Sequence, residues 1–330
     1  MPAATQFGSV EVLLATHNGE TFLEAQLNSL IAQDFEAFTV IVADDCSTDS
    51  TRAIVARFAE RHAGRFVVLP PMARRLGPSA NFGRLLDAAS ADFVFFCDQD
   101  DVWLPTKMSL SLARMAEIGA GSPDAPLLVH TDLAVVDAQL RPLGASFFAY
   151  SGIDPARNSL AALLMGNVAT GCTMLINRSL YTLARPVPRE ALMCDFWVAQ
   201  VAAGLGKLSC LRKPTVLYRQ HDGNVIGADR AGAAGFLLRV RRVLFSDKSL
   251  RVLTSFSCHA QVLAERYGTR LAARERRQVA VMASLWRIPR WLRFLALVRA
   301  GLRKPTLAAN LGLALLVLRN GRPVMPVQGD

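Results

Sequence analysis

The chain has 330 residues, of which 52% are hydrophobic and 19% are charged, which is enough for one large or two modest domains with a core that needs no disulfides. Its six cysteines, at positions 46, 97, 172, 194, 210 and 258, show no paired short spacing, so we interpret them as reduced thiols. Residues 1–10 have neither the basic nor the apolar region of a secretory signal. Composition therefore excludes a disulfide scaffold and predicts a cytoplasmic protein.

The net charge of +10 is unevenly distributed along the chain. Residues 1–229 carry 18 Lys or Arg and 23 Asp or Glu, whereas residues 230–330 carry 19 and 4. The basic part also contains apolar, Trp-bearing stretches, a mixture that suits an anionic membrane surface better than nucleic acid. We therefore predict peripheral contact with the inner face of the cytoplasmic membrane and no nucleic-acid partner.

Short apolar runs alternate with helical patterns from residue 9 onward, as in parallel strands joined by crossover helices. The pattern predicts four strands, at Val10–Ala15, Phe38–Ala43, Phe66–Leu69 and Phe93–Cys97. It predicts helices between them at Thr21–Ala32, Asp49–Arg61 and Ser79–Ala89. This is an α/β sheet of the nucleotide-binding type.

The second part of the chain has a looser pattern. It predicts further strands at Leu127–Asp132, Thr170–Ile176, Leu208–Leu211 and Thr215–Tyr218, and a helix that opens at Asp195. We place a catalytic domain at residues 1–228 and a basic amphipathic helical tail at 229–330, with Gly227–Gly235 as the junction.

Polar residues follow three of the predicted strands. The first strand leads into Thr16-His17-Asn18-Gly19, the second into Asp44-Asp45, and the fourth into Asp98-Gln99-Asp100-Asp101. Ligands of open parallel sheets bind at the carboxyl ends of the strands. The three segments therefore predict a binding site along one edge of the sheet.

The most informative of these segments is the acidic one. Asp98, Asp100 and Asp101 would repel one another unless a cation lay among them, and carboxylates suit a hard divalent metal that carries a phosphorylated substrate. An acidic turn at a strand end is the structural alternative. Asp44, at a strand end, could accept the imide N–H of uracil or thymine, although helix capping explains its neighbours Ser47 and Thr48.

Cationic and aromatic residues add to this picture. Arg84, early in a predicted helix, suits a diphosphate because its planar fork donates paired hydrogen bonds. His221 follows Arg219 on a strand-end loop, where either could meet phosphate or metal; His17 is the weaker metal candidate. Asp195 has apolar neighbours that would raise its pKa toward that of a general base, with a helix-start Asp as the alternative. Trp197 could be a platform for a sugar ring.

These residues resemble the family-two, inverting nucleotide-sugar glycosyltransferases with the A-type fold, over about residues 8–228. The resemblance rests on Val12 to Gly19, Ala43 to Thr51, Asn81-Phe82 and Phe95 to Trp103. The segment Cys97 to Asp101, together with Tyr218 to His221 and Asn224, is similar to the rhamnosyltransferase-like branch. The fold it implies is a mixed, mostly parallel sheet flanked by helices, here with a C-terminal basic helical extension.

The resemblance implies roles for these residues. Asp44 would contact the base and Asp195 would be the catalytic base, with Cys194 where many members have a further acid. His17 replaces a common Tyr. The metal, Mg2+ or Mn2+, would be held by Asp98, Asp100, Asp101 and His221. Asp100 and Asp101 match the metal-binding motif of the family, and Asp98 with Asp100 has the literal Asp-x-Asp spacing. We expect the nucleotide sugar to contact Thr16, His17, Asn18, Asp44, Asp45, Asn81, Arg84, Asp100, Trp197 and Arg219.

The implied reaction moves a sugar, by branch resemblance L-rhamnose from dTDP-rhamnose, to a hydroxyl of a surface glycan or lipid-linked oligosaccharide. A transferase that uses another UDP- or dTDP-hexose, or a non-enzymatic membrane or nucleic-acid adaptor, is the alternative. The segment Ala15 to Gly19 lacks the Gly-rich loop of a dehydrogenase or of a pyrophosphorylase.

The tail holds no stretch of about 18 apolar residues, which a spanning helix needs; Thr306–Leu318 has only thirteen residues. On a helix, Leu285, Ile288, Leu292 and Leu295 would share one side and Arg287, Arg290 and Arg293 the other, with Pro289 starting the helix. The pattern favours docking on a membrane; a helical subdomain packed on the body is the alternative.

Overall fold

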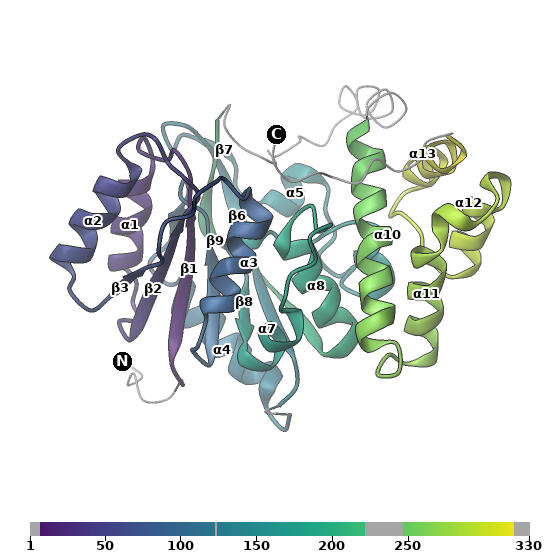
Figure 1. The fold of residues 1–330 in the computed structure, drawn as a ribbon, viewed down its shortest axis with the longest axis horizontal. Helices are drawn as coiled ribbons and strands as arrows, with labels where there is room; N and C mark the ends of the chain where they lie inside the picture. Colours follow the sequence, from purple (N-terminus) through teal and green to yellow (C-terminus); the bar gives the residue numbers. More distant parts are fainter. Residues whose placement is uncertain (1–6, 123, 222–246, 320–330) are drawn as a thin grey trace.

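A computed structural model describes residues 7–122, 124–221 and 247–319. It is built around one nine-stranded sheet of order β3-β2-β1-β4-β8-β6-β9-β5, with β7 paired to β6 (Figure 1). The first half is parallel, as predicted, and consists of β1 (Val10–Thr16), β2 (Phe38–Asp44), β3 (Phe66–Val68) and β4 (Phe93–Cys97). Because these strands are parallel, their carboxyl ends meet at one edge.

The second half of the sheet mixes directions. β8 (Leu175–Asn177) runs antiparallel between β4 and β6 (Leu127–Asp137), and β9 (Lys207–Gln220) runs parallel to β6. Two short strands, β5 (Val102–Trp103) and β7 (Pro142–Gly144), are antiparallel to β9 and β6. The prediction of a mixed, mostly parallel sheet flanked by helices is confirmed.

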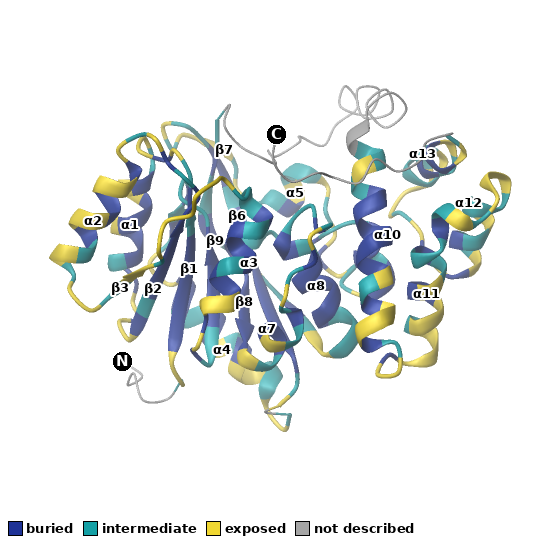
Figure 2. Ribbon diagram, viewed as in Figure 1, coloured by how far each residue is buried: buried dark blue, intermediate teal, exposed yellow. Residues whose placement is uncertain are grey.

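Alternating side chains of the central strands enter two hydrophobic clusters, one on each face of the sheet. On β1, Val12 and Leu14 belong to one cluster and Leu13 to the other, as the period of two in a strand requires. The first cluster is covered by α1 (Leu23–Ile31), α2 (Thr51–Arg61) and α4 (Lys107–Gly119). The second is covered by α3 (Pro78–Ala88), α7 (Arg178–Ala184) and α8 (Cys194–Leu205). Figure 2 shows the buried strands between these helices.

Three predicted strands differ from the structure. In the segment Thr170–Ile176, residues Gly171–Thr173 form a 3-10 turn, η1, and only β8 continues as a strand. The two strands predicted within 208–218 are one strand, β9, whose register against β6 shifts near Pro214. Short helices α5 (Phe147–Ser151) and α6 (Leu160–Leu163) connect this half.

The C-terminal part is helical: α10 (Asp247–Tyr267), α11 (Ala273–Ala283), η2 (Leu285–Arg287), α12 (Arg290–Arg299) and α13 (Leu307–Leu318). Buried Phe256 and Leu263 of α10 belong to the same hydrophobic cluster as Trp197 of α8. These helices therefore pack on the body, as the alternative interpretation had it. The proposed boundary at residue 228 and the junction Gly227–Gly235 lie outside the described residues, as does Asn224. Within the described ranges, no helix has the length and apolar character needed to cross a bilayer.

Candidate active site

The carboxyl end of β2 carries Asp44, whose buried carboxylate has a full set of hydrogen-bond donors. It accepts from the hydroxyls of Thr16 and Ser47, from the Ser47 amide at 2.9 Å and from Arg52 Nε at 2.7 Å. Burial alone would raise the pKa of Asp44, but the hydrogen bonds from Ser47, Arg52 and Thr16 together lower it. A carboxylate offers about four acceptor positions. A nucleobase would therefore have to displace a partner, and Arg52, whose side chain is 50% exposed, is the accessible one.

The segment after β1 is fastened to its neighbours on both sides. Gln99 accepts from the His17 amide and donates to the His17 carbonyl, both at 2.8 Å, which ties the end of β1 to the loop after β4. His17 Nδ1 donates to the carbonyl of Asp45 at 2.7 Å. Asn18 has φ of 46°, in the left-handed region, and its side chain accepts from the Thr48 amide. Asp45 in turn accepts from the amides of Leu76 and Gly77.

The acidic loop after β4 divides into two groups. Asp98 and Asp101 lie with Cys172, from η1, so that one ligand atom of each is within 4.8 Å of the others. Burial raises the pKa of Asp98 to about 8, and the charges of Asp100 and Asp195 add to the effect. Burial and the charges of Asp100 and Asp98 likewise raise the pKa of Asp101.

Asp100 points to a second group, on the side of β9. His221 Nε2 donates to Asp100 Oδ2 at 3.0 Å, and the imidazole lies 4.7 Å from the ring of Phe22. Arg219 donates to the carbonyls of Asp100 and Ala138, at 2.7 and 2.6 Å. Its amide also donates to Asp101 Oδ1. Arg219 is buried and holds the acidic loop against β9. Its contact with a nucleotide sugar stays a prediction.

Asp195 lies in the first turn of α8 and is nearly buried. Its Oδ2 accepts from the Gly171 amide at 3.1 Å and from Asn167 Nδ2 at 3.2 Å, and its Oδ1 accepts from the Phe196 amide. Burial raises the pKa of Asp195 to about 7, although the bonds from Phe196 and Gly171 partly oppose the shift. Because η1 bonds to Asp195 through Gly171 and carries Cys172, it links this carboxylate to the acidic group.

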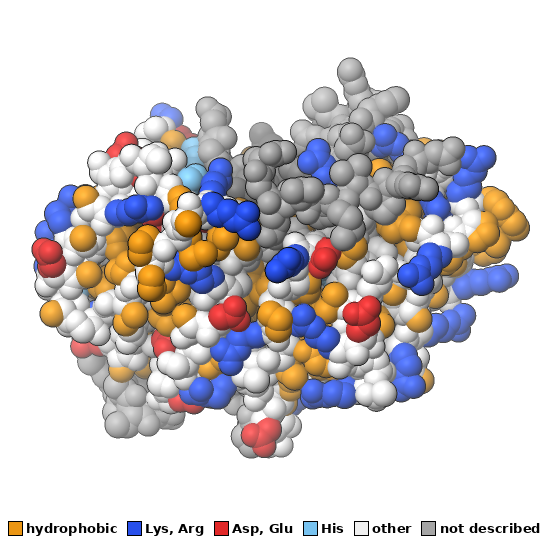
Figure 3. Space-filling view, in the orientation of Figure 1, with side chains coloured by type: hydrophobic (Ala, Val, Ile, Leu, Met, Phe, Trp, Pro, Cys, Tyr) orange, Lys and Arg blue, Asp and Glu red, His pale blue; other side chains and the backbone are white. Residues whose placement is uncertain are grey.

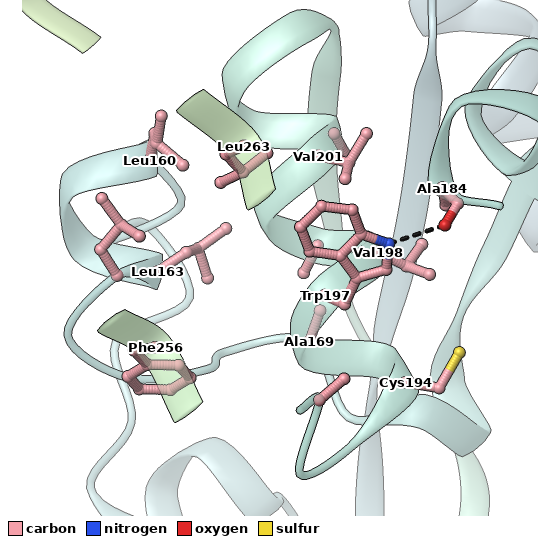
Figure 4. Close-up of a cluster of buried hydrophobic side chains, with 14 of the residues drawn as sticks. Leu160, Leu163, Ala169, Ala184, Cys194, Trp197, Val198, Val201, Phe256 and Leu263 are labelled. Carbon is pink, nitrogen blue, oxygen red and sulfur yellow. Dashed lines mark hydrogen bonds between the residues drawn. The ribbon is translucent and has the colours of Figure 1, made fainter. Parts of the chain in front are cut away.

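Trp197 does not face the site, which corrects its predicted role as a sugar platform. The indole is fully buried in the core, and its Nε1 donates to the Ala184 carbonyl at 2.7 Å. Figure 4 shows it among Leu163, Val201 and Leu263. On a helix, residues two apart point in different directions, so Asp195 reaches the site while Trp197 packs inward.

Asn81 and Arg84, on α3, have local structural partners. Asn81 is buried and donates to the Ala43 carbonyl at 2.7 Å, which holds α3 against the end of β2. Arg84 donates to the Pro70 carbonyl and lines a cavity of about 390 Å³ with Asp87 and Arg189. The residues that line this cavity do not include the acidic loop. Contact of Asn81 or Arg84 with a nucleotide sugar stays a prediction.

Sequence reasoning missed several residues that shape the site. Gln99 was part of the acidic motif but had no role. Asn167 comes from a segment without a recognisable pattern, and Cys172 lies in the predicted strand Thr170–Ile176 but had no role either. Lys107 is fully buried, with Nζ 4.6 Å from the ring of Trp103, and burial lowers its pKa to about 8. Of these residues, only Gln99 could have been found from the sequence, because it lies inside the Asp-rich segment.

Known proteins resemble parts of this chain. Residues 11–164 match the model of the family described as glycosyl transferase family 2. The chain is similar to the dTDP-rhamnosyl transferase RfbG of Shigella flexneri, with 27% identity over 231 residues that cover 66% of this chain and 74% of that protein.

Two further similarities cover different shares of the chain. A GalNAc(5)-diNAcBac-PP-undecaprenol beta-1,3-glucosyltransferase of Campylobacter jejuni is 32% identical over 108 residues, 33% of this chain and 35% of that protein. Among solved structures, S. aureus TarS 1-349 in complex with UDP has a TM-score of 0.51 at 18% identity, and the match covers 94% of this chain and 90% of that one. The structural match supports the fold alone.

Proposed function

We propose that the chain is a glycosyltransferase of family 2, because residues 11–164 match the model of that family. In this proposal it transfers a sugar from a nucleotide diphosphate to an acceptor hydroxyl with inversion. The observation that carries the proposal is the environment of Asp195. Its carboxylate is oriented by three N–H donors beside an acidic group, and its pKa of about 7 suits a general base.

The proposed steps follow from the positions of these residues. Asp195 accepts the proton of the acceptor hydroxyl, whose oxygen forms a bond to the anomeric carbon while the bond from that carbon to the diphosphate oxygen breaks. The proton stays on Asp195, and the electron pair of the broken bond leaves with the nucleoside diphosphate. The Gly171 amide and Asn167 keep the carboxylate in place for this transfer.

The acidic loop fits a divalent cation. Asp101 Oδ2 is buried with no hydrogen-bond partner among the described residues, and it lies beside Asp98 and Cys172. We propose that Asp98 and Asp101 hold Mg2+ or Mn2+, with Asp100 and His221 beside them, because carboxylate oxygens suit both ions. When bound, such an ion neutralises the charge of the departing diphosphate.

We propose dTDP-rhamnose as the donor, because RfbG is named a dTDP-rhamnosyl transferase and its alignment covers 66% of this chain. A UDP- or dTDP-hexose is the second candidate, favoured by the similarity to a named glucosyltransferase. The acceptor we propose is a hydroxyl of a cell-surface glycan or of a lipid-linked oligosaccharide.

The first prediction tests the base. Asp195→Asn should retain donor binding but lose about 10²- to 10⁴-fold in kcat, because the amide cannot accept the proton. Release of the nucleoside diphosphate from dTDP-rhamnose and from UDP-hexoses is measured with Mn2+ and with chelator. Donor binding is measured by thermal shift. Asp154→Asn, at an exposed position 57% accessible at its side chain, is the matched control and should keep full activity. Normal turnover by Asp195→Asn would refute the assignment.

A further inference from the structure

The helix α13 presents an apolar stripe to solvent. Leu307, Leu311, Leu315 and Leu318 are 79%, 59%, 49% and 44% exposed, and their spacing of four, four and three residues places them on one face. The opposite face packs inward through Leu313, Leu316 and Val317, all buried. The exposed stripe is therefore a surface of the folded helix and not the result of loose packing.

The neighbouring helix α12 adds to this surface. Trp291 and Leu295, one turn apart, are 71% and 42% exposed, and α12 packs on α13. Figure 1 shows both helices at the end of the molecule opposite α1 and α2.

The exposed side chains differ from the face predicted from the sequence. Pro289 does start α12, but Leu285 is buried in the core. Arg293 donates to the carbonyls of Ile288, Trp286 and Val317, so it joins α12 to α13 instead of lying on a solvated face. The apolar surface is carried mainly by α13.

The charge around this surface has one sign. Between Arg276 and Arg319 the sequence holds nine Lys or Arg and no Asp or Glu. Arg287, Arg299 and Arg303 are exposed beside the apolar residues. Figure 3 shows hydrophobic side chains flanked by Lys and Arg at this end of the molecule.

We propose that the exposed face of α12 and α13 docks on an anionic lipid surface. Leucines that lie in the plane of a bilayer interface bury apolar area, a Trp is favoured at that depth, and arginines beside them meet lipid phosphates. A second copy of the chain fits less well, because a two-fold interface would bring the same arginines together without an acidic partner. Nucleic acid would leave the leucines in water.

Vesicle flotation of the full chain tests the proposal. At low salt the protein should bind phosphatidylcholine vesicles that contain phosphatidylglycerol. It should bind less to vesicles without phosphatidylglycerol, which lack the negative charge, and less at high salt, which screens the attraction between charges. The double variant Leu311→Glu/Leu315→Glu should lower the vesicle-bound fraction by about tenfold or more. Leu143→Glu on β7, also 49% exposed, is the matched control and should bind like the parent.

Tryptophan fluorescence gives a second reading. Trp291 should shift to shorter wavelength on binding, and Trp291→Phe should lose most of the shift, because Trp103 and Trp197 are already buried and Trp286 is partly buried. Three results would overturn the proposal: no binding by the folded chain, equal binding by the Glu variant, or a dimer in sedimentation that the Glu variant dissociates. The assay contains no sugar nucleotide, so its failure leaves the proposed transferase activity untouched.

Discussion

Asp195 combines two properties that are usually opposed, because its environment disfavours charge while backbone and side-chain donors hold the charged form in place. Asn167 is the only side-chain donor to it among the contacts of the described residues. Asn167 also bonds to the amide and carbonyl of Ala169, so its own orientation is well defined. We therefore assign it as a positioning residue for the proposed base.

The second prediction concerns Asn167. Activity should fall as the pH drops through about 7, where Asp195 becomes protonated. Asn167→Ala removes a donor that favours the ionised carboxylate, so the acid limb of the pH profile of kcat should move to higher pH, by up to about one pH unit. The profile is measured from pH 5 to 9, and the fold is checked at both ends of this range because stability depends on pH.

Asn158→Ala is the matched control, because within the described ranges the Asn158 side chain makes a single long bond, of 3.4 Å, to the Leu208 carbonyl. Its acid limb should coincide with that of the parent. A lower kcat for Asn167→Ala with an unchanged limb would mean that Asn167 supports only the local loop and has no effect on the proton acceptor.

At the level of elements, the strand-end loops form one connected edge. Gln99 joins the loop after β4 to the end of β1, and Asn18 joins that end to the turn before α2. Gly19 is needed here because a Cβ would lie 2.2 Å from Gln99 Oε1. The carboxamide of Gln99 can move aside, so the cost of a larger residue is the loss of its two bonds to His17.

The third prediction is that Gly19→Ala destabilises the protein by about 1–3 kcal/mol through these lost bonds. Urea unfolding measures the free energy. Gln99→Ala should cost a similar amount, and the double variant no more than Gln99→Ala alone, because the clash disappears with the side chain. Additive losses would show that Gly19 is required for another reason.

The helix α10 also supports the site. Ser255 donates to the Glu190 carbonyl at 3.0 Å and accepts from the Leu192 amide at 3.1 Å, in the segment that leads into α8. His259 contacts Gln200 of α8 at 2.9 Å. Part of the chain that the sequence suggested as a tail thus holds the helix that carries Asp195.

At the level of the whole molecule, two buried histidines link folding to pH. Burial lowers the pKa of His130 to about 4 and that of His259 to about 3. Both are neutral in the folded state, whereas in the unfolded chain they bind protons below about pH 6.5. Their contribution is complete above that pH and is lost as the pH falls toward the folded pKa.

The fourth prediction uses His130, whose two ring nitrogens have no hydrogen-bond partner among the described residues. His130→Leu should flatten the fall of unfolding free energy between pH 6.5 and 4 by about 1.4 kcal/mol per pH unit, because one protonation step is removed. Chemical unfolding across this range measures the slope. His62→Leu, at a partly exposed position, should leave the slope unchanged, and an equal slope in both variants would contradict the assignment.

The sequence alone determined the parallel half of the sheet and the carboxylates at its edge. Runs such as Phe93–Cys97 are apolar throughout because parallel strands are buried on both faces, and that local pattern survives any tertiary detail. The acidic loop and Asp195 were therefore recognisable without coordinates. The start of β8 was not, because a strand of three residues has too little pattern to separate from the turn before it.

Only the tertiary structure decided which polar residues meet. Asn167, Cys172 and Asp195 are distant from Asp98 in sequence, and they converge through packing of η1 and α8 on the sheet. It also decided that Trp197 points into the core and that Leu285 is buried while the leucines of α13 are exposed. Helical spacing shows which residues share a face of a helix. Which face is buried depends on contacts with residues distant in the sequence, and a local pattern does not contain these contacts.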